Sequence, residues 1–470
     1  MKKKINSHKT TSIHWFRQDL RLADNPALHQ ASQTDEIITI FILDENQKIG
    51  GASKLWLHHS LNSLNKSLDN KLNFFSGNPL EIIKKLVKEN NITDFYWNRC
   101  YDKYSIDRDT QIKQFLQEQD INVSSFNGSL LIEPWQCKKD DGTHYKVYTP
   151  FYKELIKIRK YRSNIVKPSF NSLKKLETAD ELDSLKLLEP KLSWQNIIDQ
   201  WQIGEDASHQ ILEEFLDGKV KEYKTARDFM STDSTSKLSP YLHFGEISPN
   251  QIFNAVQSLD YIGNNEEHFI KELVWRDFSY YQIYYYPELH NKNINQKFDN
   301  FEWDNDATLL KRWQTGQTGI PIVDAGMREL WQTGYMHNRV RMIVASFLIK
   351  NCLIHWKYGE KWFFDTLFDA DFASNNANWQ WVAGCGLDAA PYFRIFNPVL
   401  QAEKFEAYEY IRKYVPELKL LPNKLLAKPW EASNLVLQES GVKLGDNYPK
   451  PMIDLKKSRD KALELHKKLS

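Results

Sequence analysis

Cysteine is scarce in this sequence, and no pattern of cysteines predicts a metal site. The 470 residues include four cysteines, and none belongs to a Cys-x-x-Cys pair or to a cluster of His and Cys residues. A zinc site needs such a cluster, so we expect no bound metal. So few cysteines in a chain of this length are typical of a protein in a reducing compartment. The four residues are Cys100, Cys137, Cys352 and Cys385.

Long apolar runs and a strong net charge are also absent. No apolar stretch is long enough to span a membrane, and the basic start of the chain, residues 1–10, is not followed by the apolar segment of a signal peptide. We therefore expect a cytoplasmic protein without membrane contact. The formal net charge is +1, so no global field predicts a nucleic-acid ligand, although a local basic surface is not excluded.

The first part of the sequence alternates short apolar runs with helical patterns. This alternation predicts an α/β domain with a parallel, doubly wound sheet. No Gly-x-Gly-x-x-Gly motif follows the first expected strand, so the usual dinucleotide loop is missing, but a ligand could still bind at the carboxyl ends of the strands. The expected strands are residues 12–16, 36–43, 72–75, 94–96 and 122–126, and the expected helices are residues 52–68, 79–90 and 107–119.

Three regions follow from the change of pattern along the chain. We expect the α/β domain at residues 8–131, a connector wrapped over the surface at residues 132–204, and a large helical domain at residues 205–470. In the helical region, Ser, Pro and Gln at positions 248, 249 and 251 predict a capped helix start. Apolar spacing predicts helices at residues 320–332 and 339–356, and the Lys-rich residues 455–469 are expected to form a solvated surface helix.

Residues 369–398 form the most informative segment of the chain. Their sequence is DADFASNNANWQWVAGCGLDAAPYFRIFNP, which combines carboxylates, asparagines, an arginine and many aromatic rings. This mixture suits a pocket for a large, flat cofactor with polar edges, whereas the alternative is a buried helix with a few satisfied polar side chains. On a helix, Trp379 and Trp381 point in nearly opposite directions, while Asp371 and Asn375 share a face.

Five further motifs occur in order along nearly the whole chain. They are WFRQDLRL at residues 15–22, KLSPYLHFGEISP at 237–249, ELVWRD at 272–277, GIPIVDAGM at 319–327 and MHNRVRM at 336–342. Together with residues 369–398, they resemble the photolyase/cryptochrome family, and most of all its bacterial cyclobutane pyrimidine dimer photolyases. The resemblance implies an α/β antenna domain with a doubly wound parallel sheet, followed by an all-α domain that binds FAD and a DNA lesion.

The resemblance also implies an activity, that of a deoxyribodipyrimidine photo-lyase. Reduced, anionic FAD absorbs a blue or near-UV photon and passes an electron to a pyrimidine dimer that is flipped out of UV-damaged DNA. The cyclobutane ring then splits and the electron returns. We expect a monomer without an obligate protein partner. The aromatic content, with 15 Trp and 22 Tyr, suits both base stacking and redox chemistry.

A dinucleotide without the usual loop needs other donors for its phosphates. Residues 235–239, Thr-Ser-Lys-Leu-Ser, offer hydroxyls, a cation and amides before an expected helix, although an ordinary capped loop is the alternative. The resemblance assigns the FAD diphosphate to this stretch. It places Arg341, paired with Asp369, beside the flavin ring, where a cation stabilises the anionic reduced form, and Asn375 opposite flavin N5. The implied cofactor-binding residues are Tyr223, Thr235, Ser236, Lys237, Leu238, Ser239, Asn338, Arg341, Asp369, Asp371 and Asn375.

Three tryptophans match the electron path of the family. Trp379, Trp356 and Trp303 correspond to residues that carry electrons from the surface to the excited oxidised flavin. A single Trp in a helical domain more often serves packing, so only the match at all three positions supports the functional reading. With Glu272 and Asn375, these tryptophans make up the expected catalytic residues.

The lesion pocket is implied by a further group of residues. Glu272 and Trp275 are three apart on an expected helix and share a face. Trp275 and Trp381 would provide flat walls for the bases, and a protonated Glu272 could donate to a lesion carbonyl. For each charged residue taken alone, a solvated or ion-paired side chain is the better interpretation. The implied substrate residues are Arg227, Glu272, Trp275, Asn338, Arg339, Met342, Trp381 and Arg394.

One position distinguishes the lesion types. The sequence has His337-Asn338, where photolyases that repair six-four lesions carry two histidines for proton donation. Cyclobutane dimer repair needs no net proton transfer, so Asn338 favours that reaction, and Met342 fits the same branch.

A second, light-harvesting chromophore is expected but not identified by the residues. In some folate-binding relatives an Asn-Glu pair stands where this chain has Tyr104-Ser105, which argues against that mode of folate binding. Methenyltetrahydrofolate bound in another way is the first expectation, and a deazaflavin or FMN stays open.

Two other functions remain as alternatives. A cryptochrome-type photoreceptor would bind flavin and signal without repair. About seventy residues follow Pro398, and much of that stretch has a helical pattern. Plant-like cryptochromes usually carry a long disordered extension, so this tail argues mildly against the photoreceptor. A DNA-binding module without flavin would be colourless, so visible flavin absorbance would exclude it.

Overall fold

The structure is a computed structural model that describes residues 9–189 and 195–469. The basic residues 1–8, on which the expectation about a signal peptide partly depends, lie outside the described residues. Among the helices that are described, none is both long and apolar enough to cross a membrane.

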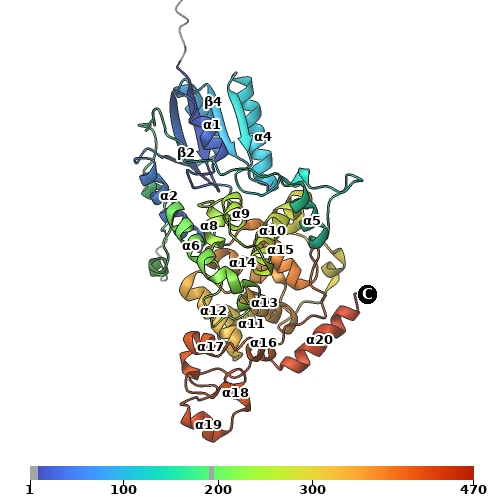
Figure 1. Cartoon of the computed structure of the whole chain (residues 1–470). Coiled ribbons are helices and arrows are strands. Elements are labelled where there is room, and N and C mark those ends of the chain that lie inside the picture. The colour runs from blue at the N-terminus through green and yellow to red at the C-terminus, as the bar shows by residue number, and fades with distance from the viewer. Residues whose placement is uncertain (1–8, 190–194, 470) are drawn as a thin grey trace, which may run out of the picture.

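The N-terminal region is built on a five-stranded parallel sheet, which confirms the predicted α/β class (Figure 1). The strand order is β3-β2-β1-β4-β5, so the direction in which the chain progresses across the sheet reverses between β1 and β4. The register pairs Ile13 of β1 with Ile38 of β2 and with Phe95 of β4. The strands are β1 (Thr11–Phe16), β2 (Glu36–Asp44), β3 (Asn73–Gly77), β4 (Asp94–Asn98) and β5 (Asn122–Phe126).

Helices cover both faces of this sheet because side chains alternate along each strand. Trp15 of β1 belongs to a buried cluster with Ile83 of α3 and Ile112 of α4. Its neighbour Phe16 faces the opposite side and packs in the same cluster as Leu55 of α2. The helices of this region are α1 (Pro26–Ala31), α2 (Gly51–Ser67), α3 (Pro79–Glu89) and α4 (Lys103–Glu118).

The C-terminal region is helical, as predicted, and lies below the sheet in Figure 1. The capping box expected at position 248 is present, since the Ser248 hydroxyl accepts from the amide of Gln251 at 2.9 Å. The helices are α6 (Glu205–Asp217), α7 (Tyr223–Ala226), α8 (Ser239–Phe244), α9 (Pro249–Gln257), α10 (Asn264–Tyr285), α11 (Ala307–Gln314), α12 (Pro321–Thr333), α13 (Asn338–Ser346), α14 (Trp356–Thr366), α15 (Phe372–Ala383), α16 (Pro398–Lys404), α17 (Tyr408–Tyr414), α18 (Asn423–Leu426), α19 (Asn434–Glu439) and α20 (Leu455–Lys467).

The prediction of one continuous helix over residues 339–356 is wrong. Helix α13 passes into a π-helical turn, Phe347–Asn351, and the chain then turns through Leu353, whose φ is 52°. A new helix, α14, begins at Trp356, and the His355 side chain accepts from the amide of Lys357 at 3.1 Å. Apolar periodicity could not reveal this break because the apolar side chains across it stay buried.

The connector contains a helix that the sequence reading missed. Helix α5 (Tyr148–Ile158) packs against α10, where the ring of Tyr148 stacks on Trp275 with centroids 3.7 Å apart and planes 5° from parallel. Part of the connector therefore packs on the helical domain next to an expected substrate residue.

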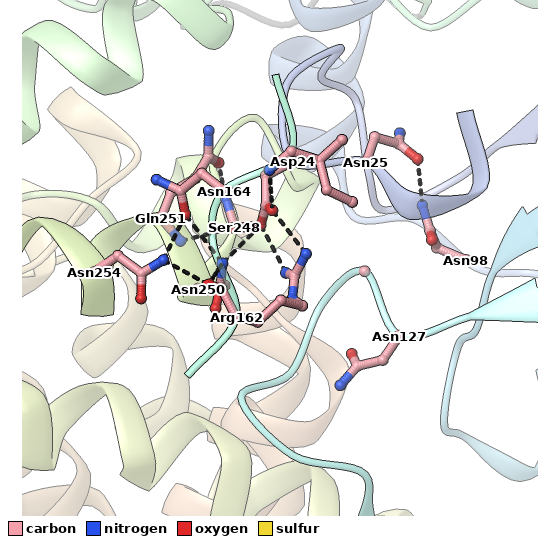
Figure 2. Close-up of polar contacts among 12 residues, drawn as sticks. Asp24, Asn25, Asn98, Asn127, Arg162, Asn164, Ser248, Asn250, Gln251 and Asn254 are labelled. Atoms are coloured by element: carbon pink, nitrogen blue, oxygen red, sulfur yellow. Dashed lines mark hydrogen bonds and ion pairs between the residues drawn. The ribbon is translucent and has the colours of Figure 1, made fainter. Parts of the chain in front are cut away.

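One buried carboxylate joins the α/β domain, the connector and the helical domain (Figure 2). Asp24 is fully buried and accepts two hydrogen bonds from the guanidinium of Arg162, both at 2.8 Å, and one from the Ser248 hydroxyl at 2.5 Å. Its amide donates to the carbonyl of Ile165 at 2.7 Å. A buried carboxylate is costly unless it is paired, so these contacts hold the three regions together.

The connector is fixed along α9 by a second set of contacts beside this carboxylate. Asn250 and Asn254 are four residues apart on α9, and both donate to Oδ1 of Asn164, at 3.0 and 2.8 Å. Both also donate to the carbonyl of Arg162, at 3.3 and 2.8 Å. The spacing of one helical turn thus forms a docking edge for residues 162–164 (Figure 2).

Replacing Asp24 by Asn should lower the free energy of unfolding by about 3 kcal/mol. This is the lower end of the range for breaking a buried ion pair, because the Arg162 side chain is 40% exposed. Urea unfolding measures this loss. The matched variant Arg162→Gln removes the other partner. In the double variant the loss should fall short of the sum by about 1 kcal/mol or more, whereas additive losses would show that the two side chains do not act together.

Candidate active site

A cavity of about 240 Å³ lies among α7, α8, α10 and α13 and the start of α15. The structure gathers around it every expected cofactor-binding residue except Asn375, although these residues are spread over some 150 positions of the chain. Three expected substrate residues, Arg227, Glu272 and Asn338, line the same cavity. The expected cofactor residues in its wall are Tyr223, Thr235, Ser236, Lys237, Leu238, Ser239, Asn338, Arg341, Asp369 and Asp371.

An arginine–carboxylate pair forms one wall of the cavity. The guanidinium of Arg341 donates to both oxygens of Asp369, at 3.0 and 2.8 Å, and the Ser239 hydroxyl donates to the same carboxylate at 2.5 Å. Burial would lower the pKa of Arg341, but the adjacent Asp369 raises it above its ordinary value. The ring of Tyr335 lies 5.2 Å from the guanidinium. A fixed positive charge therefore borders the cavity.

A second carboxylate, Asp371, is held by partners that the sequence did not suggest. Its oxygens accept from the amide of Ser374 at 2.7 Å, as N-cap of α15, and from the hydroxyl of Tyr280. Burial alone would raise its pKa, but His243, Arg276 and Tyr280 outweigh burial and lower it. Arg276 and His243 also line the cavity. Arg276 and His243 stand inside the motifs at residues 272–277 and 237–249, so the sequence offered a signal for them. Tyr280 lies outside these motifs, and the sequence offered no signal for it.

The Thr235–Ser239 stretch separates two adjoining cavities. A second cavity, of about 610 Å³, is also lined by Thr235, Ser236, Lys237 and Tyr335. Lys237 has a left-handed backbone, with φ 53°, and its ammonium pairs with Asp233 at 2.8 Å. Hydroxyls and a cation thus stand between two volumes. The smaller cavity alone is below the usual size for a large ligand.

Asn375 does not line the cavity, although the preceding residue, Ser374, does. Its amide nitrogen donates to the carbonyl and the carboxylate of Glu360, at 3.1 and 2.9 Å. Burial raises the pKa of Glu360 to about 7, and the donation from Asn375 opposes this shift. The oxygen of the Asn375 side chain makes no hydrogen bond within the described chain, so the amide keeps a free acceptor.

The expected substrate residues are only partly brought together. Glu272 forms an ion pair with Arg227 and lies 3.8 Å from His268. Both contacts are made by Oε1 of Glu272. Arg227, the C-cap of α7, is a partner that sequence spacing could not place.

The remaining five expected substrate residues do not line the cavity. Trp275 has one ring face covered by Tyr148, and Trp381 and Met342 are half-buried. Arg339 pairs with Asp228 at 2.5 Å. Arg394 is exposed, and its carbonyl accepts from the ammonium of the buried Lys350 at 2.9 Å.

The three tryptophans lie in one region and differ in exposure. Trp379 is buried, and α14 approaches it closely at Gly359, where a Cβ would stand 2.1 Å from the indole. Trp356 is fully buried and donates its indole N–H to Asn293 at 2.8 Å. Trp303 is half-buried. Trp379 and Trp356 thus both lie in the core, and Trp303 is the most exposed of the three.

The proposed antenna position is engaged by other contacts. The hydroxyl of Tyr104 donates to both oxygens of Asp44, at 3.0 and 2.8 Å, and Arg108 pairs with the same carboxylate at 3.0 Å. Ser105 is buried and its amide donates to Asp102 at 2.9 Å. These contacts fill the carboxyl end of β2. No group of three or more potential metal ligands occurs among the described residues.

Comparison with known proteins identifies the family. The model described as the FAD binding domain of DNA photolyase matches residues 269–468, and the model described as DNA photolyase matches residues 12–169. The chain is 46% identical to a deoxyribodipyrimidine photo-lyase from Agrobacterium fabrum, with 96% of each chain covered. The chain belongs to the photolyase/cryptochrome family.

Both branches of the family occur among the similar proteins. The chain is 34% identical to Cryptochrome-2 from Arabidopsis thaliana, over 96% of this chain and 77% of that protein. Its structure is similar to the crystal structure of a bacterial class III photolyase from Agrobacterium tumefaciens, with a TM-score of 0.95, 44% identity and coverage of 100% of this chain and 99% of that one. The predicted family and the predicted two-part fold are confirmed.

Proposed function

We propose that this protein repairs cyclobutane pyrimidine dimers in UV-damaged DNA, driven by light and with FAD as cofactor. The observation that carries the proposal is that the expected flavin residues and the expected lesion residues Arg227 and Glu272 line one cavity. A flavin-binding photoreceptor would need the first set and not the second.

The residues present fit FAD in their chemistry. FAD would supply absorption of visible light and one-electron chemistry. The hydroxyls of Thr235, Ser236 and Ser239 suit phosphate and ribityl oxygens, and the adjoining larger cavity offers room beyond the smaller one. Arg341, fixed by Asp369, would stabilise negative charge on the flavin ring. The free oxygen of Asn375 would accept a hydrogen bond from flavin N5.

The lesion would be held beside this site by residues of α10 and α13. Glu272 would form a hydrogen bond with the edge of a flipped base, and Trp275 and the half-buried Trp381 would stack against the bases. Arg227 would keep Glu272 oriented. We also propose that Arg339 and Arg394 contact DNA phosphates and that Met342 fills the space between the bases and α13.

The choice of lesion follows from Asn338. An asparagine amide can hydrogen-bond to a base carbonyl but cannot act as a proton donor in the way that a second histidine would. The adjacent His337 is buried, and burial lowers its pKa to about 4, so it is neutral at pH 7. The site therefore suits ring splitting without net proton transfer.

We further propose that Trp379, Trp356 and Trp303 pass electrons inward when the bound flavin is oxidised. The greater exposure of Trp303 supports its place at the outer end of the path. A folate-type antenna, action as a monomer, and domain limits at residues 131 and 204 remain proposals of the same kind.

Repair under light is the direct test. Dithionite-reduced protein is mixed with an oligonucleotide that carries one thymine cyclobutane dimer and is illuminated with blue light, beside a dark control. Loss of the dimer only under light, followed by chromatography, is the expected result. A protein that binds and photoreduces flavin normally but leaves the dimer intact would instead be a photoreceptor or act on another lesion.

Glu272→Ala should lower the yield of repair by about tenfold, because a hydrogen bond at the dimer is lost. Binding to damaged DNA should weaken less. Glu272→Gln keeps the size of the side chain and one acceptor oxygen, so its repair yield should lie between that of the wild type and that of Glu272→Ala. Unchanged repair in Glu272→Ala would remove this residue from the mechanism.

Trp303→Phe should slow photoreduction of the oxidised protein and leave repair by chemically reduced protein intact, because Trp303 lies on the electron path and away from the cavity. Absorbance under steady illumination measures the first rate, and the oligonucleotide assay measures the second. Loss of both activities would show that path and lesion pocket are not separate.

A further inference from the structure

An irregular segment, residues 388–396, runs between α15 and α16 and contacts two elements of the proposed substrate site. The carboxylate of Asp388 accepts from the amide of Tyr148, the first residue of α5, at 3.0 Å. The amide of Ala390 donates to the carbonyl of Trp381 at 3.1 Å. The 388–396 segment contains no helix or strand. Its position is therefore set by contacts with the neighbouring elements.

Within this segment, a buried ring is followed directly by two exposed side chains. Tyr392 is buried, and its ring stacks on that of His466 in α20 with centroids 4.5 Å apart. The next two residues, Phe393 and Arg394, are exposed. The amide of Arg394 donates to the carbonyl of Pro391 at 2.8 Å, which closes a turn. An aromatic ring and a cation are thus presented to solvent on a turn that is anchored in the core.

Two buried side chains, one at the end of α13 and one in the π-helical turn after it, hold this turn from the inside. The side-chain nitrogen of Lys350 donates to the carbonyl of Arg394 at 2.9 Å, and it lies 5.1 Å from the ring centroid of Tyr392. Four positions earlier, the hydroxyl of Ser346 accepts from the amide of Phe396 at 3.2 Å. These two contacts fix the backbone directly after the exposed cation.

Lys350 is a costly residue at this place because its side chain is fully buried. Burial lowers the pKa of Lys350 to about 7, the charge of Arg394 adds to this shift, and no carboxylate of the described chain opposes it. An amine buried without an ionic partner costs free energy, so an apolar side chain of similar length would pack here at lower cost. What the amine gains is its hydrogen bond to the carbonyl of Arg394.

We propose that Lys350 is a positioning residue for DNA binding, which fixes the backbone of Arg394 so that its guanidinium meets a DNA phosphate. The inference rests on the proposed function, in which Arg394 contacts DNA. Because Lys350 is buried, it cannot reach a phosphate itself and acts only through the 388–396 segment. A turn that is held in one conformation before DNA arrives avoids the loss of entropy that ordering a mobile turn would cost on binding.

The salt dependence of DNA binding tests this inference, because it counts phosphate contacts. Flavin-loaded protein is titrated in the dark, at several salt concentrations, with a duplex that carries one thymine cyclobutane dimer. Arg394→Ala should reduce the slope of log Kd against log salt by about 0.9, the contribution of one phosphate contact. Lys350→Met should reduce the slope by a similar amount and weaken binding about five- to tenfold. The double variant should show no further reduction of the slope.

Two further variants separate positioning from loss of charge and from loss of structure. Lys350→Arg keeps an N–H donor and should keep the wild-type slope. Lys85→Met removes an exposed lysine of α3, in the N-terminal domain, and should keep it as well. A merely structural role of Lys350 would lower the thermal stability of Lys350→Met and leave its slope unchanged. If Lys350→Met does not bind flavin, Ser346→Ala removes the second anchor and should reduce the slope in its place.

The outcomes distinguish this inference from the proposed function. Equal and non-additive reductions of the slope in Lys350→Met and Arg394→Ala support the positioning role. A slope that is reduced in Arg394→Ala and unchanged in Lys350→Met contradicts it and leaves the DNA contact in place. An unchanged slope in Arg394→Ala removes the phosphate contact and this inference with it. A wild type that does not prefer the damaged duplex to the same duplex without a dimer contradicts the proposed function itself.

Discussion

The pair between Arg341 and Asp369 is the contact on which the candidate site depends. It ties α13 to the turn before α15, and through the Ser239 hydroxyl it reaches the start of α8. A buried carboxylate cannot stand alone in a protein interior. Because Asp369 is buried, it needs the guanidinium of Arg341 as a partner, and this pairing places a positive charge at the border of the cavity. Electrostatic preorganisation of this kind is formed by folding itself.

The same requirement recurs at two other buried carboxylates. Asp371 is satisfied by Tyr280 and the helix cap, and Asp24 by Arg162 and Ser248. The first shapes the cavity and the second holds the domains together (Figure 2). Each buried carboxylate is therefore paired with nearby hydrogen-bond donors, and each set of contacts fixes the geometry of the neighbouring elements.

Much of this fold could be predicted from the sequence because its signals are local. Five short apolar runs predicted the five strands, and the motifs gathered the residues of one cavity. The break between α13 and α14 could not be predicted, because the apolar side chains across residues 347–354 remain buried whether or not the helix continues. Helix α5 was missed because what stabilises it is a contact with α10, more than 120 positions away.

The site shows the same division between local and distant information. Residue types at Asp371 and Glu272 were visible in the motifs, but the partners of their side chains were not. Arg227 is 45 positions from Glu272, and Tyr280 is 91 positions from Asp371. No period or cap in the sequence reports such pairs, so only the three-dimensional contacts reveal them.

The stack of Tyr148 on Trp275 places the connector against a residue of the proposed substrate site. The rear face of the indole is supplied by a residue that precedes the helical domain in the chain. A chimaera that joined a foreign N-terminal module at residue 204 would leave that face bare, whereas a junction at residue 131 would keep the two rings together. In terms of packing, α5 therefore belongs with the helices that it covers and not with the N-terminal sheet.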